Sequence, residues 1–150
     1  LYAPIFGSLN RRVAVSRFIR VLSSLHLNGV PMMQSLEVAE KVADNRVMDT
    51  IIEGLRSHVS GGGGLRDPIS SNPIFPPMVA QMVAIGEESG TLGESLEKSS
   101  NYLDREIDEM VKRLIARVEP AVTIVIAAIV GLLMLAIYLP MFDIIKGASA

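Results

Sequence analysis

An uncharged run of 23 residues, 120–142, constrains this chain more than any other feature of its sequence. Val, Ile, Leu, Ala and Met make up most of it, and Glu119 and Asp143 bound it. As a helix the run would be roughly 34 Å long, against about 30 Å for the hydrocarbon core of a bilayer. The other residues offer too little apolar surface to cover such a helix on every side. We therefore predict a transmembrane helix over residues 120–142.

The charges that flank this run predict its orientation. Only Lys146 follows it, whereas a group of basic residues precedes it: Arg105, Lys112, Arg113 and Arg117. Basic flanks tend to stay in the cytoplasm, so residues 15–119 are expected there and residues 143–150 form a short extracytoplasmic tail. We expect Glu119 and Pro120 at one membrane boundary, with Glu119 in the headgroup layer or paired with Arg117 or Lys112. Pro140 is expected to bend or end the helix near the other boundary.

Apolar residues at helical spacing predict an all-α domain before this segment. A first helix from Val15 ends at Asn28 and Gly29, and a second follows Pro31. Asp44 or Asn45 caps a third helix. The apolar stripes of these three helices are Val15, Phe18, Leu22 and Leu25; Met32, Leu36, Ala39 and Ala43; and Met48, Ile51, Ile52, Leu55 and Val59.

Three further helices complete a six-helix bundle. Residues 65–69 form one helical turn, and a fifth helix from Pro76 or Pro77 uses Met78, Met82 and Ile85. The spacing of Thr91 and Glu94 is that of a capping box, and Gly90 before it favours a left-handed conformation. The sixth helix then runs as far as Pro120 on the stripe Leu92, Leu96, Ser99, Leu103, Ile107, Met110 and Leu114. No period-two alternation predicts a strand.

The sequence lacks the residue sets that common catalytic and metal sites need. Four glycines at 61–64 are followed by neither the Lys nor the Ser or Thr of a phosphate loop, so we interpret them as a flexible connector. The chain has no cysteine and two histidines, His26 and His58, each at a predicted helix end where the dipole favours a cation. No G-x-S-x-G motif occurs. We predict no enzymatic activity and no cofactor.

Two stretches of opposite charge are candidates for partner binding. Residues 87–109 hold eight carboxylates against two basic residues, and residues 1–20 hold four arginines and no acid. The acidic stretch is interpreted as a solvated face, a docking surface, or a weak cation site with Glu37 or Glu40. The basic stretch is interpreted as a topogenic or lipid-headgroup patch, or as a partner site. The candidate contact residues are Arg17, Arg20, Glu94 and Glu97. The overall charge of −2 gives no attraction toward nucleic acid.

Several motifs in order resemble the F-domain family of inner-membrane platform proteins of type II secretion and type IV pilus machines. They are Asn28-Gly29-Val30-Pro31, Phe75-Pro76-Pro77, the turn from Gly86 to Leu92, Glu119-Pro120, and Leu139-Pro140-Met141-Phe142. Members of that family have two copies of a six-helix cytoplasmic domain and three membrane helices. The resemblance implies that this chain is the second copy with the last membrane helix, and that residues 1–14 lead out of a preceding membrane segment.

The same resemblance implies a function. Family members are not enzymes; they are thought to contact a hexameric secretion or pilus motor ATPase and to couple its motion to the movement of pilin or pseudopilin subunits. It further implies homo-oligomers and contact with other inner-membrane assembly proteins. Because the chain starts at Leu1, we expect it to be part of a longer protein without a secretory signal at its start. The alternatives are a membrane-anchored fragment of a sensor or enzyme whose active part is missing, and a receptor-like tether.

Overall fold

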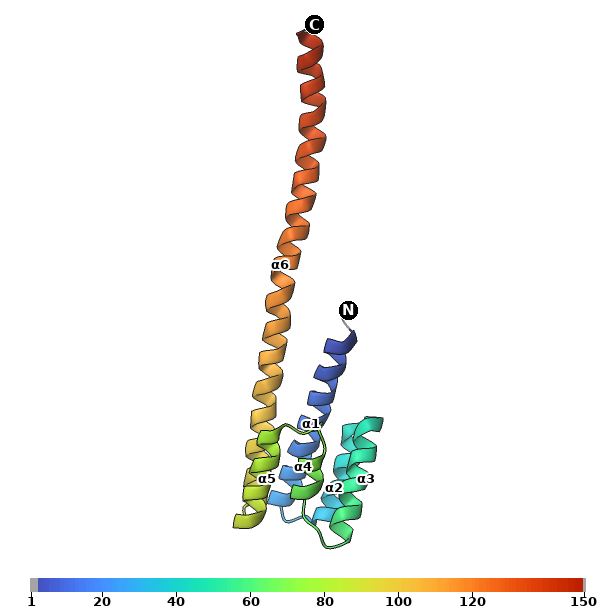
Figure 1. Cartoon of the computed structure of the whole chain (residues 1–150), viewed down its shortest axis with the longest axis vertical. Coiled ribbons are helices and arrows are strands. Elements are labelled where there is room, and N and C mark those ends of the chain that lie inside the picture. Colours follow the sequence, from blue (N-terminus) through green and yellow to red (C-terminus); the bar gives the residue numbers. More distant parts are fainter. Residues whose placement is uncertain (1–2, 150) are drawn as a thin grey trace. The chain divides into compact units, whose positions relative to one another are not determined.

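The computed structural model describes residues 3–149 and is all-α, with no strand among these residues. Its helices, labelled in Figure 1, are α1 (Ala3–Leu27), α2 (Met32–Ala43), α3 (Arg46–Ser60), α4 (Arg66–Ser71), α5 (Pro77–Ser89) and α6 (Leu92–Ala148). The predicted fold class, six helices with an apolar segment at the C-terminal end, is confirmed.

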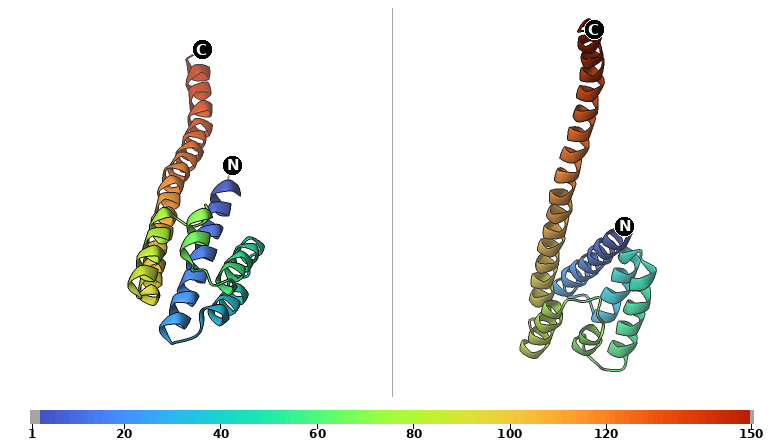
Figure 2. Two further views of the ribbon diagram at one scale, coloured as in Figure 1. Left: turned by 60° about the horizontal axis from the view of Figure 1, so that its bottom comes forward. Right: turned by 45° about the horizontal axis from the view of Figure 1, so that its top comes forward.

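The contacts divide the chain into two compact units, the first ending at Glu109 and the second beginning at Met110. The first unit holds α1 to α5 and the start of α6. Within it α1 contacts α2, α2 contacts α3, α3 contacts α4, and α4 contacts α5. Figure 2 shows α2 and α3 side by side in both views, as expected for helices joined by a two-residue connection.

The core of the first unit forms where the apolar stripes of its helices meet. Most predicted stripe residues are fully buried, including Phe18, Leu22, Leu36, Met48, Ile52, Leu55, Leu96 and Leu103. The rings of Phe18 and Phe75 lie 6.3 Å apart, centroid to centroid, and are tilted by 50°, so the loop before α5 also contributes an aromatic side chain to the core.

Two helices differ from the prediction. First, α1 begins at Ala3 rather than at Val15. Its first turns hold few buried side chains, so no apolar stripe marks them, but Pro4 lies in the first turn, where its missing N–H breaks no hydrogen bond. The described part of the predicted leader is therefore helical, while Leu1 and Tyr2 lie outside the described residues.

Second, the predicted core face of α5 is wrong at Met78 and Ile85, although Met82 is half-buried and accepts a hydrogen bond from Ser99. Met78 and Ile85 are 42% and 62% exposed, whereas Val79, Val83 and Gly86 are buried. Both residue sets have helical spacing, so the pattern alone did not discriminate between them. Gly86 decides the packing: a Cβ there would lie 2.5 Å from Ser95 Oγ and 3.0 Å from Leu92 Cα. Only a residue without a side chain lets α5 approach the start of α6 this closely.

The helix ends follow local chemistry. The side chain of Asn45 caps α3 by accepting the Val47 N–H at 3.0 Å, and Asp44 ends α2 in a left-handed conformation with φ of 43°. Gly90, with φ of 72°, ends α5 as predicted. Thr91 precedes the first residue of α6, and its hydroxyl oxygen lies 2.7 Å from Ser89 Oγ. The capping box of Thr91 and Glu94 stays a prediction.

Candidate functional site

A polar contact region joins α1 to α6 within the first unit. Arg12 donates to Glu106 Oε2 at 2.5 Å, and the Ser16 hydroxyl donates to Asp104 Oδ1 at 2.6 Å. Arg20 forms an ion pair with the same Asp104 carboxylate. We call these five residues the α1–α6 seam. The seam pairs two arginines of the basic stretch with two carboxylates of the acidic stretch. These four charges, which the sequence offered as candidates for partner binding, therefore neutralise one another inside the fold.

Tyr102 extends this seam. Its hydroxyl donates to Glu106 Oε1 at 2.8 Å. That hydrogen bond, followed by burial and by the negative charge of Glu106, raises the pKa of Tyr102 above its usual value of 10.0. Tyr102 therefore stays protonated at neutral pH and acts as a hydrogen-bond donor.

The four predicted contact residues divide into two kinds. Arg17, Glu94 and Glu97 are exposed, and none of them forms an ion pair within residues 3–149. Arg20 is also exposed, at 54% of its side chain, but its guanidinium is engaged by Asp104. Arg17, Glu94 and Glu97 thus have free charges to offer, and their role in partner binding stays a prediction.

Other carboxylates are used inside the fold. Glu87 accepts the backbone N–H groups of Leu65 and Arg66 at the start of α4, the second at 3.3 Å. Glu37 and Glu40 pair with Arg56 at 3.0 and 3.1 Å, so the two ligands considered for a cation site already have a partner. Over residues 3–149, no three His, Cys, Asp or Glu side chains gather where they could hold a metal ion.

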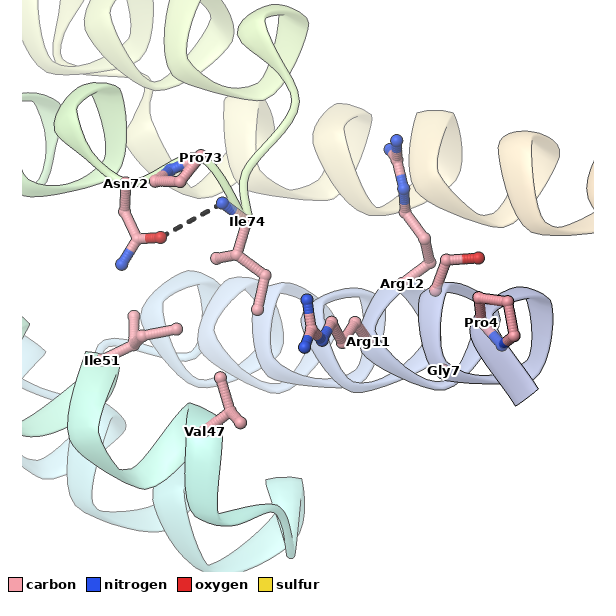
Figure 3. A pocket seen from close by; sticks show the side chains of 10 residues that line it. Pro4, Gly7, Arg11, Arg12, Val47, Ile51, Asn72, Pro73 and Ile74 are labelled. Carbon is pink, nitrogen blue, oxygen red and sulfur yellow. Dashed lines mark hydrogen bonds between the residues drawn. The ribbon is translucent and has the colours of Figure 1, made fainter.

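A groove of the first unit lies between α1, α3 and the loop before α5 (Figure 3). It has a volume of about 740 Å³ and is lined by Pro4, Gly7, Ser8, Arg11, Arg12, Val47, Ile51, Asn72, Pro73 and Ile74. The Asn72 side chain accepts the Ile74 N–H at 3.1 Å and shapes the loop. Arginine and apolar side chains suit binding, but none of these lining residues is a carboxylate or histidine that could serve as a general base.

The second unit consists of the remainder of α6. This helix is the one described helix long and apolar enough to cross a membrane; its most apolar window has a mean hydropathy of 2.8 and no buried residue. Pro120 and Pro140 both lie inside α6, which continues to Ala148. Of the two outcomes predicted for Pro140, an end of the helix is wrong, because neighbouring turns keep the backbone helical around a single missing N–H, and a bend stays a prediction.

Glu119 lies at the start of the apolar run. Its backbone carbonyl accepts the Thr123 hydroxyl at 3.1 Å. In the described part of the chain neither Arg117 nor Lys112 forms an ion pair with the Glu119 carboxylate. The roles of Glu119, Pro120 and Pro140 at the membrane boundaries stay predictions.

Residue spacing in the sequence does not predict the α1–α6 seam. Its members are 88 and 94 residues apart in the chain, so no local spacing joins them. The one available signal was the opposite charge of the two stretches, which we had interpreted as two separate surfaces.

Comparison with known proteins identifies a family. The family model described as type II secretion system (T2SS), protein F matches residues 18–140. This match begins in α1 and ends within the apolar part of α6, so it covers most of both units.

Individual relatives agree with this match. The chain is 40% identical over 150 residues to the type IV pilus assembly protein PilC of Thermus thermophilus. The aligned region covers 99% of this chain and 37% of that protein. It is 34% identical to PilC of Myxococcus xanthus, over 96% of this chain and 34% of the relative. It is 31% identical to the type II secretion system protein F of Aeromonas hydrophila, over 96% of this chain and 37% of that relative. The chain thus spans little more than a third of the length of these relatives.

Proposed function

The chain belongs to the type II secretion system protein F family, and from that premise we propose that it is part of a non-enzymatic platform in the bacterial cytoplasmic membrane. The observation that carries this proposal is the family match over residues 18–140, which includes the candidate membrane helix. The names of the relatives point to a type IV pilus or a type II secretion machine.

The proposed role is mechanical coupling. A hexameric motor ATPase docks on the first unit, and the platform transmits its motion to pilin or pseudopilin subunits and to other inner-membrane assembly proteins, as a homo-oligomer. The free charges of Arg17, Glu94 and Glu97 support docking, since exposed charges steer and orient partners. The groove between α1, α3 and the loop before α5 supports a binding role, since it is lined by arginine and apolar side chains and by no carboxylate or histidine.

The proposed orientation places the first unit in the cytoplasm. It is supported by the basic residues that precede the apolar run, which outnumber the single Lys146 after it. A motor that hydrolyses ATP needs this side of the membrane, so orientation and coupling are consistent with each other.

Charge reversals test the docking step. Arg17→Glu alone, and Glu94→Lys with Glu97→Lys, are introduced into the full-length protein in cells, with pilus or secretion output and motor co-purification as readouts. We expect lower output and salt-sensitive loss of the motor, because reversal turns attraction into repulsion. Lys41→Glu on α2, also exposed, is the matched control.

Normal folding, full motor retention and full output in both reversal variants would contradict the proposed docking residues. Turnover of nucleotide by the purified chain alone would contradict the non-enzymatic role itself.

A further inference from the structure

A continuous apolar stripe runs along the second unit and begins before the uncharged run. From Val111 to Ser149 every residue except the half-buried Leu114 is exposed. The stripe repeats every seven residues, with alternating steps of three and four between its members. We call it the α6 heptad stripe. Its members are Val111, Leu114, Val118, Ala121, Val125, Ala128, Leu132, Leu135, Leu139 and Phe142.

The first members of the stripe lie where a bilayer around residues 120–142 does not cover them. Inside that run nearly every residue is apolar, so any repeat would be satisfied there. Val111 lies nine residues before Pro120, which is about 13 Å along the helix and beyond a headgroup layer of about 5–8 Å. Val111 and Val118 are nevertheless 37% and 51% exposed, and Ile115 is 62% exposed. A row of exposed apolar side chains outside the bilayer marks a protein interface.

Charges and chain breakers are kept off this stripe. In the coiled-coil notation, Val111 takes position a of a heptad and Leu114 takes position d, the two positions that face a partner helix. Both prolines of α6 and most charges before the uncharged run then fall at the outer positions b and c, so they do not interrupt a close approach. These outer residues are Lys112, Arg113, Glu119, Pro120 and Pro140.

We propose that the α6 heptad stripe pairs with the same stripe of a second copy of this chain, as a parallel two-stranded coiled coil. Copies that share one membrane also share its orientation, so their α6 helices run in the same direction. Valine at position a with leucine at position d, as in Val111, Val118 and Leu114, favours two parallel strands. The strict seven-residue repeat continues for more than four heptads, and Ala121 and Ala128 let the helices approach closely within the bilayer.

A different helix is the competing occupant, either from another membrane protein or from the part of the longer relatives that this chain does not span. A second copy fits because a parallel pair brings no like charges together at the flanking positions g and e. Met110 lies opposite Ile115 there, and Arg117 lies opposite Val122. The inference rests on the homo-oligomer in the proposed function, names its surface, and does not depend on the motor.

Disulfide formation between copies tests the pairing. Leu114→Cys and Val118→Cys place a thiol on the stripe, and Lys112→Cys and Ala116→Cys, at exposed outer positions of the same turns, are the matched controls. Each is introduced alone into the full-length protein, with every other cysteine replaced by serine, in cells that make two differently tagged copies. Isolated membranes are treated with copper phenanthroline, and disulfide-linked pairs that carry both tags are measured.

We expect two-tag pairs to form several-fold faster from Leu114→Cys and Val118→Cys than from either control, because a disulfide requires Cα atoms within about 7 Å of each other. Adding Val118→Lys to the Leu114→Cys protein should lower the rate several-fold, since it places two like charges inside the interface. Adding Ala116→Lys instead should leave the rate unchanged.

Equal rates at all four positions would indicate random collision and would overturn the inference. The absence of two-tag pairs from Leu114→Cys and Val118→Cys, or an adduct of these thiols with a different protein, would also overturn it. If the protein still migrates as a homo-oligomer in detergent without such pairs, the oligomer of the proposed function stands and only this surface fails. The docking test with Glu94 and Glu97 is independent of each of these results.

Discussion

The Ser16 hydroxyl on α1 donates a hydrogen bond to Asp104 on α6 at 2.6 Å, across 88 residues of sequence. The same carboxylate pairs with Arg20, and Arg12 pairs with Glu106, two residues further along α6. The helix that continues into the apolar segment is thus joined to α1 at this level by polar groups, which lie beside core side chains such as Leu103. These contacts are candidates for the joint through which the bundle holds that helix.

Charge reversal at Arg20 tests the seam. Arg20→Glu places a second carboxylate beside Asp104 and should lower the free energy of unfolding by about 1 kcal/mol, a modest value because both side chains are partly exposed. Arg17→Glu, one turn away and unpaired, should stay within about 0.5 kcal/mol of the wild type. Thermal melts of the detergent-solubilised chain measure both. Recovery of stability in the double variant Arg20→Glu with Asp104→Arg would confirm the pair, and identical melts of all the variants would refute it.

Tyr102 should lose its phenolic proton at a higher pH than an unperturbed tyrosine does. Its pKa is raised in the folded state, so the fold holds the phenolic proton more tightly than the unfolded chain does. The resulting stability is fully present below about pH 10, the usual value, and is lost as the pH rises through the folded pKa. Ultraviolet absorbance of tyrosinate, compared between wild type, Tyr102→Phe and Glu106→Gln, checks this. A Glu106→Gln curve that matches the wild type would show that the hydrogen bond is not the cause.

Gly86 should be the least replaceable glycine of the turn before α6. Gly86→Ala places a methyl group against Ser95 and the Leu92 backbone, and overpacking of this kind costs about 1–3 kcal/mol. Gly90→Ala meets nothing within 4 Å and should cost only about 1 kcal/mol, for its positive φ. Thermal melts of the two variants show which of them is less stable. Ser95→Gly combined with Gly86→Ala should recover part of the loss; a Gly86→Ala variant as stable as Gly90→Ala would contradict the close approach.

The faces of α2 and α3 were predictable because each has one dominant apolar stripe and clear caps, such as Asn45. The face of α5 was not, since Met78 and Ile85 compete with Val79 and Val83, and a glycine at the closest contact carries no hydropathy signal. Among the candidate contact residues, the exposure of Arg17 followed from its place opposite the core. The pairing of Arg20 depends on a residue far along the chain, which spacing does not show.

Cysteine labelling tests the orientation. The chain has no cysteine, so Ser57→Cys in α3 and Ser149→Cys after α6 each introduce a single thiol at an exposed position. In intact cells an impermeant reagent should label Ser149→Cys and spare Ser57→Cys, because the basic flank keeps the first unit in the cytoplasm. Both should react after the membrane is permeabilised. Labelling of Ser57→Cys in intact cells would reverse the topology.

Site-specific photocrosslinking in cells tests most directly whether the first unit receives a motor. A photoreactive residue at Glu97 on α6, and separately at Arg17 on α1, is compared with one at Lys41 on α2, all at exposed positions of the full-length protein. The account predicts a covalent adduct at Glu97 or Arg17 whose mass identifies the motor ATPase, which is lost when the motor gene is deleted. Adducts to the motor from Lys41 alone, or from none of the three positions while the machine is active, would contradict it.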